Sequence, residues 1–261
     1  MEVQVERLAG EEAGIVLLGL DRPSAKNALG RQLLTEFRAA LGALRDDPAV
    51  RVLVVHSRVP GVFCSGADLK ERAGMSPEEA VVFVEGLRAA FSELGDLPMP
   101  TIAAIDGAAF GGGLELALAA DLRVAGAGAK MGLVETSLAI LPGAGGTQRL
   151  PRLIGASRAK ELIFTARRIG AEEASRLGLV NRVVAAGRAL ESALALAREI
   201  LPNGPVALRA AKRAVDQGIQ LDLASGLALE QACYAQVIPT KDRLEGLAAF
   251  RDKRKPEYRG E

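Results

Sequence analysis

Short apolar runs alternate with amphipathic segments through the first two thirds of the chain. Runs rich in branched side chains predict buried strands over residues 14–20, 51–57, 101–106 and 122–125. The spacing of apolar side chains between these runs predicts helices over residues 30–44, 76–94 and 114–120. Strands that alternate with helices are typical of an α/β fold with a buried, largely parallel sheet.

The last third of the chain is predicted to be mostly helical from residue 157 onward, apart from a short strand over 179–184. A Pro-Asn-Gly-Pro break at residues 202–205 divides this part. We therefore expect an α/β core over 1–201 and a separate helical region over 202–261. The helices of that region are rich in Leu and Ala, and their apolar faces are expected to pack against a neighbouring copy of the chain.

Charge and composition exclude several classes of protein. The 33 basic and 32 acidic residues nearly balance, which excludes a histone-like partner of bulk nucleic acid. Cys64 and Cys233 lie far apart, and His56 is the single histidine, so neither a disulfide framework nor a metal cluster is expected. No signal pattern is visible at the start, and residues 97–120 are broken by charges and glycines, so we expect an intracellular protein without a membrane span.

Three consecutive glycines, residues 111–113, follow a predicted strand and open a predicted helix. Backbone N–H groups can come close to a ligand there, because no Cβ stands in the way. The same N–H groups at a helix start suit a developing oxyanion. Glu115 lies in the first turn of this helix among apolar neighbours, so it is either a helix-start acid stabilised by the dipole or a buried catalytic group.

Glu135 is a second lone acid among apolar neighbours, and it precedes another glycine-rich turn over 142–146. Alone, it is best interpreted as a loop carboxylate that caps nearby amides. Together with Glu115, it suggests a pair of carboxylates that hold one water and divide the acid and base roles.

A third segment, Phe63-Cys64-Ser65-Gly66-Ala67-Asp68, ends a predicted strand. The small residue after Gly66 can supply a second oxyanion-hole N–H. Cys64 has no base placed to activate it, and we interpret it as a buried, inert thiol.

Motifs for nucleotides and nucleic acids fit poorly. Gly126, Gly128 and Gly132 have one residue too many for a dinucleotide fingerprint, and the turn over 145–147 lacks the lysine of a phosphate loop. Arginines on the helix over 31–45 have no interleaved aromatic side chain, so they are interpreted as a solvated face.

These segments, in this order, resemble the enoyl-CoA hydratase/isomerase family, also called crotonases. The resemblance rests on RPSAKNAL at 22–29, GVFCSGADLKE at 61–71, PTIAAIDGAAFGGGLELALAADLRVA at 100–125 and LPGAGGTQRLPRLIG at 141–155. Within the family, the segments over 70–76, 130–140 and 233–261 look most like the methylglutaconyl-CoA hydratase group.

The resemblance implies a role for each residue at a matching position. Ala67 and Gly112 match the two backbone N–H donors that hold the thioester oxygen. Glu115 matches the carboxylate that activates water, and Glu135 matches the one that delivers a proton to the α-carbon. Gly143 lies in the turn that helps to hold the water.

The resemblance also implies where coenzyme A binds. The groove for CoA is expected to involve Ala25, Lys26, Ser65, Asp68, Leu69 and Lys70. Tyr234 and Lys253 match C-terminal positions that reach CoA from a neighbouring subunit. Ser65 stands where the family usually has Ala, and it is small enough for the groove to be kept.

For the whole molecule, the family implies a superhelix of repeated ββα turns, with 1–201 as catalytic core and 202–261 as a region that mediates homotrimers or hexamers. It implies no metal or cofactor, since CoA is part of the acyl-CoA substrate. The expected location is the bacterial cytoplasm, or the mitochondrial matrix where a transit peptide has been removed.

The expected reaction is addition of water across the 2,3 double bond of an enoyl-CoA thioester, with 3-methylglutaconyl-CoA as a candidate substrate. Having both Glu115 and Glu135 favours hydration, because isomerases of this family typically lack the first acid. An isomerase of the same fold and a hydratase homologue with an RNA-binding side role are the alternative hypotheses, with nucleic acid the less expected partner.

Overall fold

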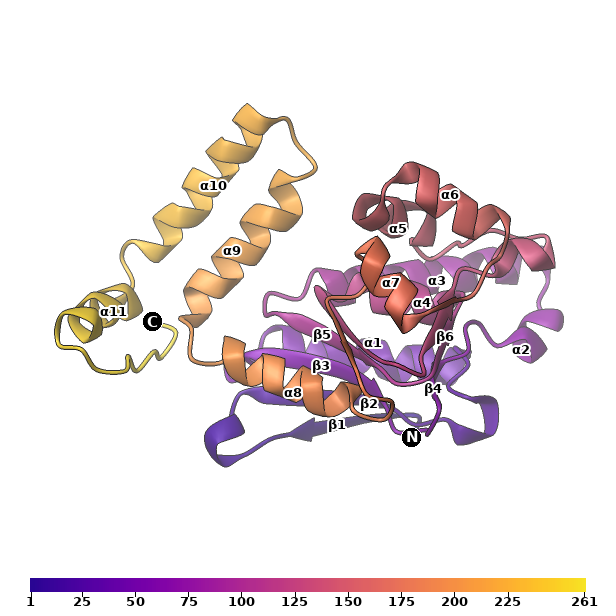
Figure 1. The fold of residues 1–261 in the computed structure, drawn as a ribbon, viewed down its shortest axis with the longest axis horizontal. Coiled ribbons are helices and arrows are strands. Elements are labelled where there is room, and N and C mark those ends of the chain that lie inside the picture. The colour runs from indigo at the N-terminus through magenta and orange to yellow at the C-terminus, as the bar shows by residue number, and fades with distance from the viewer.

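The computed structural model describes residues 1–261, which form two sheets and eleven α-helices. Strands and helices alternate along the chain, and the helices lie around and between the sheets (Figure 1). The α/β class predicted from the hydrophobic pattern is confirmed, including its largely parallel sheet.

The larger sheet has six strands, and the five after the first run parallel to one another. Its order is β1 (Val3–Arg7), β2 (Ile15–Leu20), β3 (Val52–Ser57), β5 (Thr101–Ile105), β7 (Leu122–Gly126) and β10 (Arg182–Val184). β2 and β5 are buried along their whole length, as continuous apolar runs in a sheet covered on both faces should be.

The smaller sheet has four short strands, in the order β4 (Val62–Cys64), β6 (Ala108–Phe110), β8 (Lys130–Gly132) and β9 (Ile169–Gly170). Each of β3, β5 and β7 in the large sheet is followed by a strand of the small sheet. Helices then follow: α3 (Pro77–Gly95), α4 (Gly112–Ala119) and α5 (Gly146–Ile154). The chain therefore repeats a ββα unit, and each repeat brings a strand end of the small sheet to the same side of the molecule.

The two faces of the large sheet pack against different partners. On one face, α1 (Arg31–Arg45) buries its predicted apolar stripe of Leu33, Leu34, Phe37, Leu41 and Leu44 in the main core. On the other face, α8 (Ala189–Ile200) approaches closely through Ala189, Ala193 and Ala197, which repeat every fourth residue. The remaining helices of the first part are α2 (Leu69–Ala73), α6 (Ala156–Phe164) and α7 (Ala171–Leu177).

Among the segments that differ from the sequence-based expectation, three show why it failed. β1 was not predicted, because it is an edge strand that is mostly exposed and exists through its antiparallel pairing with β2. The turn expected over 107–113 contains β6, which pairs with β4 and β8. The strand expected over 179–184 begins only at Arg182, since Leu179 and Val180 belong to the core below α7.

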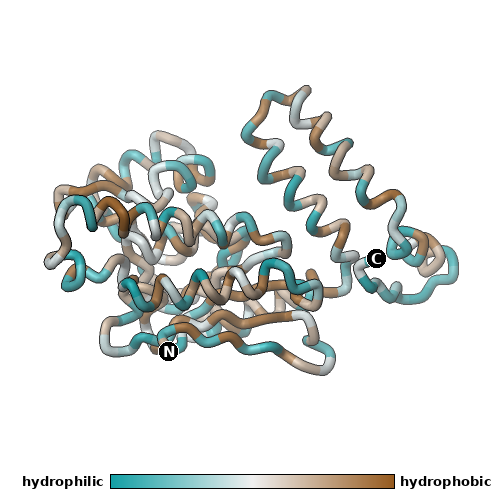
Figure 2. Tube along the Cα trace, turned by 180° about the vertical axis from the view of Figure 1, so that it is seen from behind, coloured by the Kyte–Doolittle hydropathy of each residue, from teal (hydrophilic) through white to brown (hydrophobic).

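The C-terminal helices α9 (Pro205–Gly218), α10 (Leu223–Val237) and α11 (Lys241–Arg251) follow the Pro-Asn-Gly-Pro break. α9 and α10 form a helical hairpin that stands away from the sheets (Figure 1). Hydrophobic positions recur along this hairpin with no other element over them (Figure 2). The exposed ones are Val215, Ile219, Leu221, Leu223, Leu227, Tyr234 and Ile238, and α11 adds Leu244, Leu247 and Phe250. None of the helices is both long and apolar enough to cross a membrane.

Candidate active site

A cavity of about 730 Å³ lies between α2, α3, the start of α4 and the segment that follows β8. Seven of the residues singled out from the sequence line it together, namely Ser65, Ala67, Leu69, Gly112, Glu115, Glu135 and Gly143. These residues come from four segments spread over about eighty positions, and the fold brings them together.

Two backbone amides lie side by side at the wall of this cavity. Gly66, with a φ of +100°, packs so tightly on the neighbouring segment that an added Cβ would lie 2.8 Å from Phe110 O and 3.6 Å from Gly112 N. Leu29 N donates to Gly66 O at 2.8 Å, and Asp68 N donates to Leu29 O at 3.0 Å, which secures the chain on both sides of Ala67. Gly112 is the first residue of α4, so its N–H has no acceptor within the helix.

Gly111 and Gly113, on either side of Gly112, are required for different reasons. An added Cβ on Gly113 would lie 2.2 Å from Cys64 O, so only glycine lets α4 pack against β4. An added Cβ on Gly111 would lie 3.1 Å from Glu135 Oε1, so Gly111 makes room for the second carboxylate. Close packing therefore accounts for glycine at both positions.

Glu115 is 3% exposed, and its carboxylate reaches across to the turn over 142–146. Its Oε1 accepts hydrogen bonds from Ala144 N at 2.9 Å and Gly146 N at 2.7 Å. Burial raises the pKa of Glu115, while these two bonds and the charge of Arg149 act in the opposite direction. The helix-start acid is therefore a buried group with one oxygen held in place.

Two arginines that the sequence did not single out hold the other side of this turn. Arg88 Nε donates to Gly143 O at 3.1 Å, and Arg149 Nη1 donates to Ala144 O at 3.1 Å. The turn thus donates its amides to Glu115 and accepts from two guanidinium groups. The glycine-rich turn itself could be found in the sequence. The arginines that bind it could not, because Arg88 lies 55 positions and Arg149 lies 5 positions from its acceptor, and no pattern links either pair.

Glu135 opens the 3₁₀ turn η3 (Glu135–Leu138) and is 9% exposed. Its carboxylate contacts its own N–H, whereas Ser137 N donates to Val134 O, so the carboxylate does not cap the amides that follow it, as the capping interpretation requires. Its Oε2 is buried without a hydrogen-bond partner. Burial, and then the negative charge of Glu115, raise the pKa of Glu135 to about 7. A carboxyl group with this pKa can hold and release a proton near neutral pH.

Ala25 and Lys26 lie beside the cavity without lining it. Ala25 ends the 3₁₀ turn η2 (Pro23–Ala25), and Lys26 is exposed with a φ of 52°. Ser65 joins them to the cavity wall, since its N donates to Lys26 O at 3.2 Å and its Oγ donates to Ala25 O at 3.3 Å. Asn27, which the sequence reasoning missed, is fully buried and donates to Ser57 Oγ and Phe63 O.

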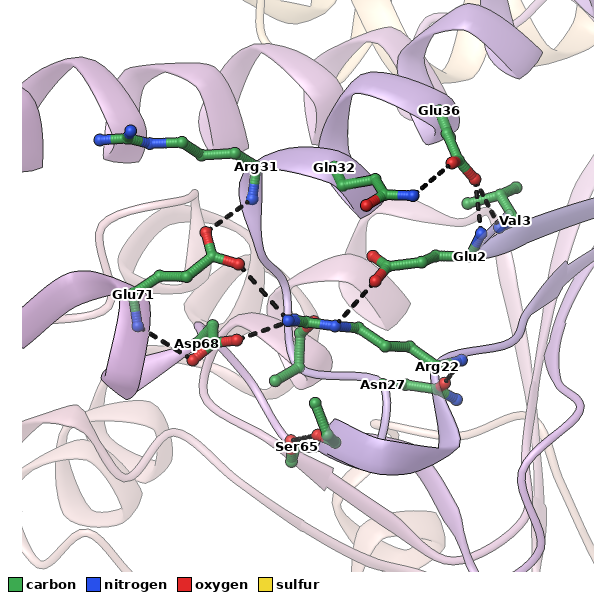
Figure 3. A network of polar contacts seen from close by, with 12 residues as sticks. Glu2, Val3, Arg22, Asn27, Arg31, Gln32, Glu36, Ser65, Asp68 and Glu71 are labelled. Atoms are coloured by element: carbon green, nitrogen blue, oxygen red, sulfur yellow. Dashed lines mark hydrogen bonds and ion pairs between the residues drawn. The ribbon is translucent and has the colours of Figure 1, made fainter.

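Asp68 does not line the cavity, and its side chain reaches toward Arg22 (Figure 3). Its Oδ1 accepts from Lys70 N and Glu71 N, so Asp68 is the N-cap of α2, and the Lys70 side chain is exposed. Tyr234 on α10 and Lys253 after α11 are also exposed, and neither lines the cavity of its own chain.

The remaining candidates are accounted for by the core and by ion pairs. Cys64 is buried, its Sγ donates to Asn27 O at 3.0 Å, and burial raises its pKa to about 12, as an inert thiol requires. Arg31 and Arg38 on α1 pair with Glu79 and Glu93 of α3. Nowhere do three or more His, Cys, Asp or Glu side chains gather in a way that could hold a metal ion.

Known proteins resemble the chain over its whole length. It is 57% identical to human mitochondrial methylglutaconyl-CoA hydratase over 264 residues, which is 100% of this chain and 78% of the relative. It is 56% identical to the mouse mitochondrial enoyl-CoA hydratase domain-containing protein 2, covering 99% of this chain and 89% of that protein. The crystal structure of an enoyl-CoA hydratase from Bacillus anthracis matches with a TM-score of 0.97, at 48% identity and full coverage of both chains.

That structural match confirms the expected crotonase fold, and relatives occur both in mitochondria and in bacteria. A family profile described as enoyl-CoA hydratase/isomerase matches residues 10–261, which include every segment that forms the cavity. The chain therefore belongs to the enoyl-CoA hydratase/isomerase family.

Proposed function

We propose that this protein is an enoyl-CoA hydratase, which adds water across the 2,3 double bond of an enoyl-CoA thioester. One observation carries the proposal: two buried carboxylates, Glu115 and Glu135, and the amides of Ala67 and Gly112 meet at one cavity. Hydration needs this combination, because negative charge develops on the thioester oxygen while one proton leaves water and another reaches carbon.

In this mechanism, the thioester oxygen lies between the N–H groups of Ala67 and Gly112. Glu115 accepts a proton from water as the oxygen of that water bonds to C3, and the electrons of the double bond move onto the thioester oxygen as an enolate. Glu135 then gives its proton to C2, and the enolate returns to a thioester. The electrostatic stabilisation by preorganised amides is the largest expected contribution. These steps need no metal or redox cofactor, and CoA arrives as part of the substrate.

An isomerase would need a single base to move a proton between two carbons. The position of Glu115 disfavours an isomerase, because the amides of Ala144 and Gly146 hold its carboxylate where it can orient a water. An RNA-binding role gains no support from α1, because Arg31 and Arg38 of its arginine row are engaged with acids of α3.

The acyl chain is proposed to carry a second carboxylate, as in 3-methylglutaconyl-CoA. Arg72, Arg88 and Arg168 line the cavity, and none of them forms an ion pair within the chain. Arg168 lies over the ring of Phe110, 4.6 Å from its centroid. The only acids in the lining are the two proposed catalytic ones, so a substrate carboxylate would find an excess of positive charge. The human relative that carries this substrate in its name supports the same choice.

Steady-state kinetics with crotonyl-CoA and 3-methylglutaconyl-CoA test both parts of the proposal. We expect turnover of both and a higher kcat/KM for the second. Arg72→Leu and Arg168→Leu should reduce that preference by about 10- to 100-fold, the effect of a lost charged hydrogen bond of about 1.5–3 kcal/mol. Arg45→Leu, an exposed arginine outside the cavity, is the matched control. Hydration of neither substrate contradicts the hydratase, whereas equal kcat/KM values contradict only the second carboxylate.

We further propose a homotrimer or hexamer in which Tyr234 and Lys253 reach the CoA of a neighbouring subunit. The exposed apolar side chains of α9–α11 support it, since an uncovered surface of this kind usually marks an interface. The lysine suits the phosphates of CoA. The proposed location is the bacterial cytoplasm or the mitochondrial matrix, with no membrane or nucleic-acid partner.

A further inference from the structure

Arg22 lies at the centre of a charged network beside the cavity (Figure 3). It follows the end of β2, and its side chain is 17% exposed. Its Nε lies 3.0 Å from Glu2 Oε1, its Nη1 2.8 Å from Asp68 Oδ2 and its Nη2 3.4 Å from Glu71 Oε1. One guanidinium therefore faces three carboxylates, one from the N-terminal segment and two from the start of α2.

This network joins the two segments that flank the proposed binding groove. Arg22 Nη1 also donates to Ala28 O at 2.8 Å, within the turn that carries Lys26. Asp68, its partner, directly follows Ala67 and caps α2 through the amides of Lys70 and Glu71. The guanidinium thus connects the turn over 22–29 to the residue next to the proposed oxyanion donor.

The backbone of Arg22 closes the same turn. Arg22 N donates to Asn27 Oδ1 at 2.8 Å, and Asn27 N donates to Arg22 O at 3.0 Å. Lys26 and Asn27 have positive φ values of 52° and 53°, a conformation that is uncommon for non-glycine residues. The turn therefore depends on Arg22 at both its backbone and its side chain.

The site is built for an arginine. The planar guanidinium presents five donors in fixed directions, so it can serve three carboxylates and a carbonyl at once, which a lysine ammonium on its flexible stem does less well. Gly30 lies close to the same groups, because an added Cβ would lie 2.3 Å from Glu71 Oε1 and 2.8 Å from Arg22 Nη1, so a side chain at this position would displace these two side-chain ends.

We propose that Arg22 is a positioning residue for hydration, which acts through Asp68 to hold the amide of Ala67 at the thioester oxygen. The inference rests on the proposed role of Ala67 as an oxyanion donor. Arg22 does not line the cavity and touches no reacting atom. Its effect on the rate is geometric, because a displacement of about 1 Å in a catalytic group can lower turnover by about 100-fold.

The first test compares Arg22→Gln and Arg22→Lys with wild type on crotonyl-CoA. Arg22→Gln should lower kcat by about 10- to 100-fold in folded protein, and Arg22→Lys by less, since it keeps one charge but not the fork. KM should change much less than kcat. Arg31→Gln is the matched control, because Arg31 pairs with Glu79 close by and its side chain lies outside the network.

The second test reads the oxyanion site directly. Infrared difference spectra of bound butyryl-CoA, which has no double bond to hydrate, give the stretching frequency of the thioester carbonyl. Wild type and Arg31→Gln should lower this frequency relative to free butyryl-CoA, and Arg22→Gln should lower it less. Asp68→Asn keeps an oxygen to cap α2 but loses the ion pair, so it should give the same result as Arg22→Gln. It replaces Arg22→Gln in both tests if Arg22→Gln does not fold.

A purely structural role would reduce thermal stability and leave both kcat and the carbonyl frequency of the folded variants at wild-type values, which would overturn the inference alone. If binding to wild type leaves the carbonyl frequency unchanged, Ala67 is not an oxyanion donor, and this contradicts both that proposed role and the present inference. A reduced frequency shift together with a reduced kcat in Arg22→Gln or Asp68→Asn supports it.

Discussion

Glu135 has a pKa of about 7, which makes hydration sensitive to pH near neutrality. In the proposed mechanism Glu135 must hold a proton, while Glu115 must be ionised to accept one from water. The reacting form of the enzyme therefore carries a single proton on the carboxylate pair. Raising the pH removes this proton, so we expect kcat/KM to fall above neutrality.

The size of the fall follows from the titration of one group. With a pKa of about 7, about one half of Glu135 is protonated near pH ~7 and about one tenth near pH ~8. The value of kcat/KM therefore falls about fivefold over this pH unit. Each further pH unit lowers it about tenfold. The assay follows the loss of ultraviolet absorbance as the conjugated enoyl thioester is hydrated.

The reverse reaction provides an internal check. Hydration consumes no net proton, so its equilibrium constant does not depend on pH. Dehydration begins with the same single proton placed on Glu115 instead of Glu135. The profiles of kcat/KM for the two directions must therefore share the same alkaline limb, as expected when the apparent pKa belongs to the pair.

Glu115→Gln is the informative variant, because it removes the negative charge that helps to raise the pKa of Glu135. The alkaline limb of its residual activity should move to lower pH, whereas Glu172→Gln, which changes an exposed acid of α7, should leave the limb in place. A wild-type kcat/KM that is flat between pH of about 6 and about 9, or an unmoved limb in Glu115→Gln, refutes the reasoning.

Three further predictions concern catalysis, stability and assembly. Glu115→Gln should lower kcat by about 10²- to 10⁴-fold while calorimetry finds CoA-ester affinity retained; near wild-type turnover would remove its assigned role. Because the pKa of Glu135 is raised from 4.5 to about 7 in the folded chain, its contribution to stability is lost as pH rises through that range. Urea unfolding should therefore show that wild type loses about 3 kcal/mol more stability over this range than Glu135→Gln, in which only other groups such as Glu115 respond; an equal response in both proteins contradicts it. Light scattering should find trimers or hexamers for the full chain and monomers or aggregates after deletion of residues 230–261. Lys253→Ala should raise KM for CoA esters several-fold at nearly constant kcat. A fully active monomer would contradict the proposed assembly.

Elements that depend on near neighbours along the chain could be predicted well. The stripe of α1 follows from apolar residues three and four positions apart, and Ser76 and Glu79 form a capping box at the start of α3. β1 and β6 could not be predicted in this way, because each exists through hydrogen bonds to strands elsewhere.

The sequence by itself singled out the candidate residues: two isolated acids, each beside a glycine-rich turn, and a small residue after Gly66. Only the tertiary structure decided what surrounds each of them. The carboxylate of Glu115 is held by amides 29 and 31 positions away. The pKa of Glu135 depends on burial and on the charge of Glu115, and Arg22 meets its partners only through packing. Hydrogen bonds, burial and charge interactions all depend on distances in space, which the order of residues along the chain does not contain.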